Sequence, residues 1–243
     1  MISSQSAPRL LGAAFLIVIV TSLIAGIPLV SVVGNSTGSG VELGSIPDML
    51  EKIANNLTQV RIGILGGLLN STAIVALAVL LYVVLSEQNR IMALAALGLW
   101  LAEAVFFAIM QIGALALIPL SRDFVNAAAT VSPFYQTLGD FLYNGLYSQG
   151  MTLHMWFYCA GGLLWYYLFY RSRYVPRAIS LFGLLAVTMG LAGVMLQLFG
   201  YEVPIFVSLP IGLFELIIGA WLLLKGIKGQ QPATAQAIPR QVT

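Results

Sequence analysis

Hydrophobic runs dominate the pattern of this chain, and six of them are about as long as a bilayer-spanning helix. A transmembrane helix needs about 20 mostly apolar residues to cross roughly 30 Å of hydrocarbon. The pattern therefore predicts an all-α fold, a polytopic membrane protein built as a bundle of six transmembrane helices. The predicted spans are residues 9–33, 62–86, 91–118, 141–170, 178–199 and 205–227.

We assign residues 1–228 to a single six-helix transmembrane domain. The segment 229–243 is rich in Gln, Ala and Pro, a composition typical of a disordered tail. The first run begins at Arg9 and has no small-residue cleavage site before the next polar stretch. We therefore interpret it as a retained span and not as a cleaved signal peptide.

The first polar loop carries the signals of a helix start. Ser45 and Asp48 have capping-box spacing, and Pro47 occupies a first-turn position. The apolar residues that follow fall on one helical face, which predicts a short amphipathic helix on the outer membrane surface. These residues are Ile46, Met49, Leu50, Ile53, Leu57 and Val60. The helix could be a lid packed on the bundle or a gate, and the sequence leaves both open.

A second long loop is predicted over residues 121–139, followed by a helix from Asp140 to Tyr170 that exceeds the bilayer thickness. Two polar stripes follow this helix. One contains Tyr143, Tyr147, His154 and Tyr158, and the other contains Asn144, Ser148 and Thr152. Because polar stripes are costly against lipid, we expect the helix to line an interior cavity. His154, Tyr147 and Tyr158 are predicted to line that cavity, which would open toward the outer face.

Composition agrees with a membrane protein, since 59% of residues are hydrophobic and only 8% are charged. The net charge of +2 is too small and dispersed to indicate a nucleic-acid partner. The single cysteine, Cys159, excludes an intrachain disulfide and a cysteine-rich metal site.

Lys and Arg residues are distributed unequally between the two sets of loops. Three stand on one side: Lys52, Arg61 and Arg122. Eight stand on the other: Arg9, Arg90, Arg171, Arg173, Arg177, Lys225, Lys228 and Arg240. The positive-inside rule predicts that both termini are cytoplasmic. The aromatic residues Trp165, Tyr166, Tyr167 and Tyr170 precede Arg171, where an interfacial belt is expected.

Two glutamates stand near the middle of predicted spans, Glu103 in the third and Glu215 in the sixth. A charged side chain at the helix centre costs about 3 kcal/mol on insertion scales, so both carboxyls should face the bundle interior. They could be functional groups or neutral carboxyls that hydrogen-bond neighbouring helices. The candidate ligand or proton site comprises Glu103, Glu215, His154, Arg61, Gln111, Tyr147 and Tyr158. For Gln111, Asn70 and Gln197 an interhelical hydrogen bond is the favoured role.

Several chemistries lack the residues they need. One histidine cannot make a bis-histidine haem site, and no lysine lies at depth to form a retinal Schiff base. Motifs of hydrolases, zinc proteases, nucleotidases and dinucleotide-binding proteins are missing. A metal site of Glu103, Glu215 and His154 would require three spans to converge, which the sequence cannot show. We assign no metal and no catalytic residue, and the cofactor is left unknown.

Several motifs resemble the bacterial multi-pass membrane proteins of the domain of unknown function 4386 family. They are Arg9-Leu10-Leu11-Gly12, Arg61-Ile62-Gly63-Ile64-Leu65, Ala102-Glu103-Ala104, the segment from Leu168 to Arg177, and Glu215 followed by the segment from Trp221 to Gly226. The resemblance covers about residues 9–228 and implies a six-helix fold in a bacterial cytoplasmic membrane, with no assigned activity. Near Trp100, where the family pattern leads us to expect an arginine, this chain has none, so no arginine partner for Glu103 is implied.

Three functional hypotheses remain. A proton-coupled or small-solute transporter would use Glu103 and Glu215 as titrating groups. A non-catalytic accessory subunit of a larger complex, binding lipid or quinone, would use the same groups as structural contacts. An intramembrane enzyme would need His154 as a third catalytic group. The partners implied are the lipid bilayer, a small amphiphilic ligand, and a second copy or a larger membrane complex.

Overall fold

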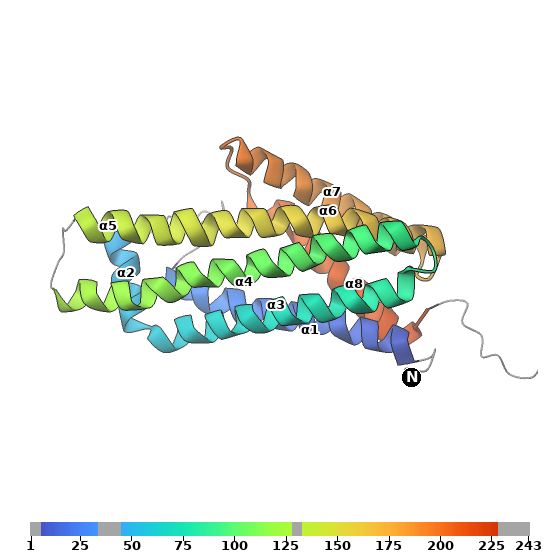
Figure 1. Cartoon of the computed structure of the whole chain (residues 1–243), viewed down its shortest axis with the longest axis horizontal. Coiled ribbons are helices and arrows are strands. Elements are labelled where there is room, and N and C mark those ends of the chain that lie inside the picture. Colours follow the sequence, from blue (N-terminus) through green and yellow to red (C-terminus); the bar gives the residue numbers. More distant parts are fainter. Residues whose placement is uncertain (1–5, 34–44, 128–132, 228–243) are drawn as a thin grey trace, which may run out of the picture.

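A computed structural model describes residues 6–33, 45–127 and 133–227 of the chain, and the regular elements in these ranges are all helices (Figure 1). The prediction of an all-α fold is therefore confirmed. The helices are α1 (Ser6–Val33), α2 (Ile46–Asn55), α3 (Leu57–Leu85), α4 (Arg90–Asn126), α5 (Pro133–Asp140), the π-helix η1 (Phe141–Ser148), α6 (Gln149–Ser172), α7 (Arg177–Leu198), the 3-10 turn η2 (Ile205–Val207) and α8 (Leu209–Lys225).

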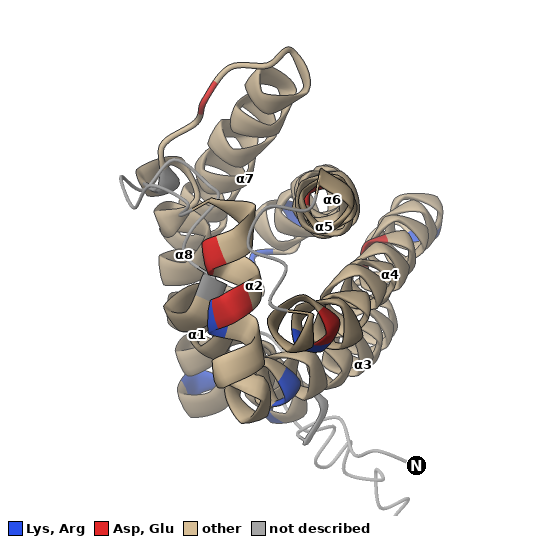
Figure 2. Ribbon diagram, turned by 90° about the vertical axis from the view of Figure 1, so that its left-hand side faces the viewer, with Lys and Arg blue, Asp and Glu red and all other residues tan. Residues whose placement is uncertain are grey.

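The long helices close into a ring. Each packs on the next in the order α1, α3, α4, α6, α7, α8, and α8 packs back on α1. Viewed along the bundle, α6 lies between the α3–α4 pair and α7 (Figure 2). The start of α1 and the end of α8 meet, with Pro8 beside Gly226, and we call this the terminal end. Helix α2 crosses the opposite end, which we call the α2 end (Figure 1).

Four helices within the described ranges are long and apolar enough to cross a membrane, and the protein is therefore an integral membrane protein. The four segments are Pro8–Val32, Leu57–Leu85, Arg90–Asn126 and Arg177–Leu198. Helices α6 and α8 occupy the other two predicted spans but do not belong to this set. Helix α8 has 17 residues, which is about 26 Å at 1.5 Å per residue. The sequence-based prediction of six spans is thus confirmed for four.

Helix α2 begins at the capping box that the sequence predicts. The Asp48 backbone N–H donates to Ser45 Oγ at 3.4 Å, and the Ser45 N–H donates to Asp48 Oδ2 at 3.1 Å. The buried face of α2, made of Met49, Leu50 and Ile53, joins an apolar cluster with residues of α4. The apolar face of this helix is therefore covered by protein.

The predicted bounds of the second loop, residues 121–139, are wrong, because helices extend into this range from both sides. Helix α4 continues to Asn126, and α5 already begins at Pro133. The reason is packing beyond the predicted span: Phe124 of α4 is buried and meets Tyr135 of α5 edge-on, with ring centroids 5.6 Å apart. This contact and the cover that α2 provides stabilise helix where hydropathy alone indicates a loop.

The overlong fourth-span helix is present and begins earlier than expected. Helices α5, η1 and α6 follow one another without a break from Pro133 to Ser172. Its middle segment, η1, is a π-helix, whose i→i+5 hydrogen bonds change the angular spacing of side chains. A Cβ added at Gly113 of α4 would lie 2.8 Å from the Leu142 carbonyl oxygen, so α4 and η1 approach closely there.

Candidate functional site

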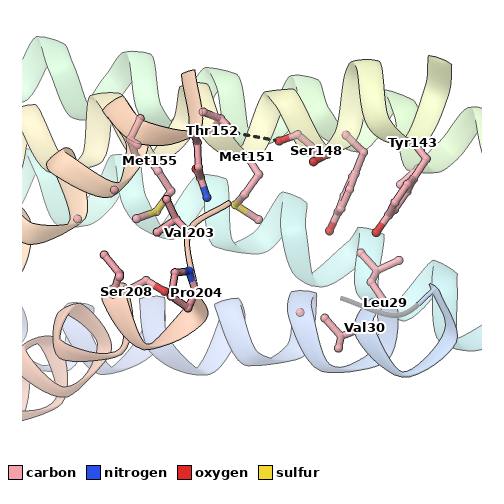
Figure 3. Close-up of a pocket in the computed structure, with 18 of the residues that line it drawn as sticks. Leu29, Val30, Tyr143, Ser148, Met151, Thr152, Met155, Val203, Pro204 and Ser208 are labelled. Carbon is pink, nitrogen blue, oxygen red and sulfur yellow. Dashed lines mark hydrogen bonds between the residues drawn. The ribbon is translucent and has the colours of Figure 1, made fainter. Parts of the chain in front are cut away.

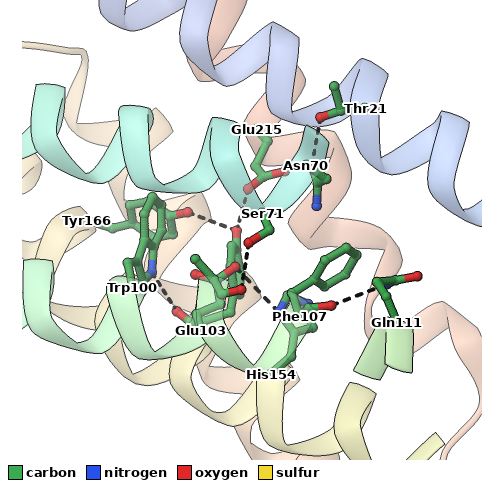
Figure 4. Close-up of polar contacts among 12 residues, drawn as sticks. Thr21, Asn70, Ser71, Trp100, Glu103, Phe107, Gln111, His154, Tyr166 and Glu215 are labelled. Atoms are coloured by element: carbon green, nitrogen blue, oxygen red, sulfur yellow. Dashed lines mark hydrogen bonds and ion pairs between the residues drawn. The ribbon is translucent and has the colours of Figure 1, made fainter. Parts of the chain in front are cut away.

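Both mid-span glutamates lie inside the helix ring. Glu103 of α4 is 2% exposed and Glu215 of α8 is 8% exposed. Around them lie His154, Tyr158 and Tyr166 of α6, and we call these five residues the carboxyl cluster (Figure 4). A polar group without water must find its partners inside the protein, so the hydrogen bonds of this cluster determine its chemistry.

The first part of the cluster pairs Glu103 with the only histidine. His154 Nδ1 lies 3.6 Å from Glu103 Oε1, and Phe107 meets the imidazole edge-on with centroids 4.8 Å apart. The separation is longer than a direct hydrogen bond, which spans about 2.7–3.2 Å. Among the described residues, Glu103 Oε2 and His154 Nδ1 have no hydrogen-bond partner. This pair therefore retains unused hydrogen-bonding capacity in a buried position.

The second part is a hydrogen-bonded chain that ends on Glu215. Tyr158 donates to Glu215 Oε1 at 2.8 Å, and the Tyr158 and Tyr166 hydroxyls are 3.0 Å apart. A phenol has a single O–H to donate. Because Tyr158 gives its own to Glu215, Tyr166 must donate to Tyr158, and the donor order is Tyr166, Tyr158, Glu215.

Helix α6 connects the two parts, because His154 and Tyr158 stand one helical turn apart. Trp100 of α4 holds this turn in place. Its indole N–H donates to the Tyr158 carbonyl oxygen at 3.1 Å, and its ring stacks on the Tyr158 ring at 5.6 Å. At Gly161 an added Cβ would lie 2.8 Å from Trp100 Nε1, so the absence of a side chain there makes room for the indole.

The other predicted site residues lie outside the cluster. Gln111 donates to the Phe107 carbonyl oxygen of its own helix at 3.2 Å, and Gly67 of α3 makes room for its amide. Asn70 accepts a 2.8 Å hydrogen bond from Thr21, which links α3 to α1. Arg61 is exposed near the α2 end of α3. The structure therefore brings together Glu103, Glu215, His154 and Tyr158, and separates Gln111 and Arg61 from them.

Sequence reasoning missed Tyr166 and Trp100 as cluster residues. Tyr166 was expected in an interfacial belt, yet it and Trp165 are fully buried, whereas Tyr167 is 42% exposed. The eight-residue spacing between Tyr158 and Tyr166 was a usable signal, since it corresponds to about two helical turns on one face.

A cavity of about 260 Å³ lies toward the α2 end of the ring (Figure 3). Its walls come from α1, α2, α3, α4, η1, α6, α7 and the segment leading into α8. The lining residues are Gly26, Leu29, Val30, Ile53, Val60, Ala114, Leu117, Tyr143, Tyr147, Ser148, Met151, Thr152, Met155, Gly190, Gly193, Val194, Gln197, Val203, Pro204, Val207 and Ser208.

The composition of this lining differs from the prediction. Tyr147 lines the cavity and stacks on Tyr143 at 5.9 Å, whereas His154 and Tyr158 are not among the lining residues. Those two side chains belong to the carboxyl cluster and turn toward α4 and α8. The second predicted stripe contributes instead, through Ser148 and Thr152.

Metal binding finds no support in the geometry. Within the described ranges, no three His, Cys, Asp or Glu side chains are grouped so that they could hold a metal ion. Glu103, Glu215 and His154 therefore do not form the three-residue ligand set considered from the sequence.

The ring, its buried carboxyl cluster and its apolar spans define an all-helical integral membrane protein. Residues 10–226 match the domain of unknown function 4386 (DUF4386) family, and the chain belongs to that family. No curated protein and no solved structure matched the chain.

Proposed function

We propose that the protein is a proton-coupled carrier of a small solute. In this proposal Glu103 and Glu215 bind the protons and the cavity holds the solute. The observation that carries it is that helix α6 contributes side chains both to the cluster around two buried carboxyls and to the wall of the cavity. Met155 lines the cavity, immediately follows His154 in sequence, and lies less than one turn before Tyr158.

The surroundings of Glu103 support a role in proton binding. A carboxylate away from water needs a cation, a proton or strong hydrogen bonds. Of the described cationic side chains, only His154 comes within ion-pair distance of Glu103. The pair can therefore hold one proton on either partner, and it has free hydrogen-bonding positions on both.

The carrier would have six spans, with α6 and α8 completing the ring. Six described cations gather at the terminal end: Arg9, Arg90, Arg171, Arg173, Arg177 and Lys225. Three lie toward the α2 end: Lys52, Arg61 and Arg122. By the positive-inside rule the terminal end faces the cytoplasm and the α2 end faces outward.

A ligand-free titration tests the proton-binding role. Trp100 stacks on Tyr158 within the cluster, so its fluorescence should respond to a change of charge on either glutamate. We expect a pH-dependent emission change in the purified protein that Glu103→Gln and Glu215→Gln each alter. The matched control is Glu202→Gln, which removes an exposed carboxyl in the segment after α7. A titration curve unchanged by both cluster variants would reject the proton-binding role.

A second measurement tests coupling to a solute. Proteoliposomes on a solid-supported membrane would receive pulses of monooctanoylglycerol, an uncharged amphiphile. Proton-coupled movement of an uncharged solute carries charge, whereas leakage of the solute through lipid does not. We expect a transient current in the unmodified protein and in Glu202→Gln, and none in Glu103→Gln or Glu215→Gln.

One observation favours an alternative, a non-catalytic ligand-binding subunit. The hydrogen-bonded chain Tyr166–Tyr158–Glu215 joins α6 to α8. Such a chain is more typical of a contact that stabilises the fold than of a site that binds and releases protons. Under this alternative Glu215→Gln lowers stability, and neither glutamate variant alters the pH dependence of the fluorescence.

A further inference from the structure

We propose that the cavity binds an uncharged amphiphile that reaches it from the lipid phase by passing between α1 and α7. This inference rests on the proposed function and deepens it, because it names the class of solute and its route.

The chemistry of the lining selects an uncharged molecule. None of the described lining residues carries a charged side chain. A charged headgroup would therefore be desolvated without a counterion, at a cost that an uncharged head avoids. Two methionines, Met151 and Met155, give part of the wall an adaptable apolar surface.

The polar groups of the lining come from η1, α6, α7 and the start of α8. They are the hydroxyls of Tyr143, Tyr147, Ser148, Thr152 and Ser208 and the amide of Gln197. Helix α1 contributes only Gly26, Leu29 and Val30. In the proposed complex the hydrogen-bonding end of the ligand meets these groups, and its apolar end packs on the α1 residues.

The route follows from the arrangement of the two helices. Both α1 and α7 contribute to the cavity wall, yet they do not pack against each other. Helix α7 diverges from the bundle as it approaches the α2 end (Figure 1). Val30 of α1, which lines the cavity, is apolar and 45% exposed. In a bilayer such a surface contacts hydrocarbon, so this part of the cavity wall faces lipid.

Glycine 26 offers a way to fill the cavity without straining the protein. A Cβ added at Gly26 would meet no atom within 4 Å, and the same is true of Gly98, an exposed residue of α4 away from the cavity. Gly26→Leu therefore places a side chain in the cavity, whereas Gly98→Leu adds the same side chain elsewhere on the surface. Val30→Trp provides a second obstruction, at an exposed residue of the cavity wall.

The test is photolabelling in liposomes with a diazirine-bearing, alkyne-tagged monoacylglycerol. Parallel samples receive the same chain with a carboxylate head or a trimethylammonium head. We expect labelling of peptides containing Val30, Met151 and Val194 that unlabelled monoacylglycerol displaces. Labelling should fall about tenfold in Gly26→Leu, which corresponds to about 1.4 kcal/mol of binding free energy, and should be unchanged in Gly98→Leu. Val30→Trp should lower the rate at which the cavity peptides are labelled.

Three outcomes would overturn the inference. The first is labelling that unlabelled monoacylglycerol does not displace and that spreads over all lipid-facing peptides. The second is equal labelling of the cavity peptides by either charged probe, and the third is no effect of Gly26→Leu. The labelling requires no proton movement, so it stands apart from the test of the proposed function. The labelling can be displaceable while neither the fluorescence titration nor the current changes in the Glu103 and Glu215 variants. That combination would reject proton coupling and would still support binding of an uncharged amphiphile.

Discussion

Tyr158 donates a 2.8 Å hydrogen bond to Glu215 and so joins α6 to α8, two helices whose backbones do not pack directly against each other. The contact spans the interior of the helix ring. It binds the second carboxyl to the tyrosine that stands one helical turn from His154, and it determines which tyrosine hydroxyl donates to the other. The stability of the ring and the chemistry of its centre therefore depend on the same hydroxyl.

Replacement of Tyr158 by Phe should lower the free energy of unfolding by about 1–3 kcal/mol, because Glu215 Oε1 and the Tyr166 hydroxyl both lose a buried partner. Denaturation of the purified protein in mixed micelles would measure the change. Tyr147→Phe is the matched control, since it keeps the ring that stacks on Tyr143 and should change stability by less than about 0.5 kcal/mol. Equal losses in the two variants would contradict a special role for the Tyr158 hydroxyl.

Glu103 and His154 should show energetic coupling. We expect Glu103→Gln and His154→Gln to be non-additive in unfolding free energy by about 1 kcal/mol, because their side chains lie 3.6 Å apart. In the reference cycle, Glu202→Gln takes the place of Glu103→Gln. The effects of Glu202→Gln and His154→Gln on the unfolding free energy should add within about 0.5 kcal/mol. Additivity in both cycles would mean that the pair does not interact.

The α1–α8 contact should tolerate no side chain at Gly12. A Cβ at Gly12 would lie 2.8 Å from the Gly219 carbonyl oxygen, and a backbone atom cannot move aside cheaply. Gly12→Ala should therefore cost about 1–3 kcal/mol of stability. In contrast, Gly98→Ala, with nothing within 4 Å of the added atom, should be neutral or gain up to about 1 kcal/mol from helix propensity. Thermal unfolding of the two variants would separate these results, and a stable Gly12→Ala protein would rule out the close approach.

Orientation in the membrane can be measured with single cysteines after Cys159→Ser. Lys52→Cys on α2 should react with a membrane-impermeant maleimide applied to intact cells. Arg171→Cys at the terminal end should react only after permeabilisation. Both native side chains are exposed, so packing does not limit either reaction. Labelling of both positions from the same side would contradict the six-span arrangement, and the reverse pattern would contradict the orientation.

The sequence by itself determined where the helices lie and which residues deserved attention. Apolar runs of membrane length predicted the positions of α1, α3, α4 and α7, because the cost of unpaired backbone groups in lipid leaves few alternatives to a helix. Ser45 and Asp48 identified the start of α2, since a capping box is a local interaction. Glu103, Glu215 and His154 stood out because ionisable groups are rare at that depth.

Only the tertiary structure decided which of these groups meet. The pairing of Glu103 with His154 and of Glu215 with Tyr158 depends on the order of helices in the ring and on the rotation of each about its axis. Helices that bury side chains on several faces carry little periodic signal for that rotation. The continuation of α4 to Asn126 likewise depends on Phe124 meeting Tyr135. Tyr166 lies inside the cluster because its helix, α6, packs against several other helices at once. Such contacts join residues distant in sequence, and local patterns do not encode them.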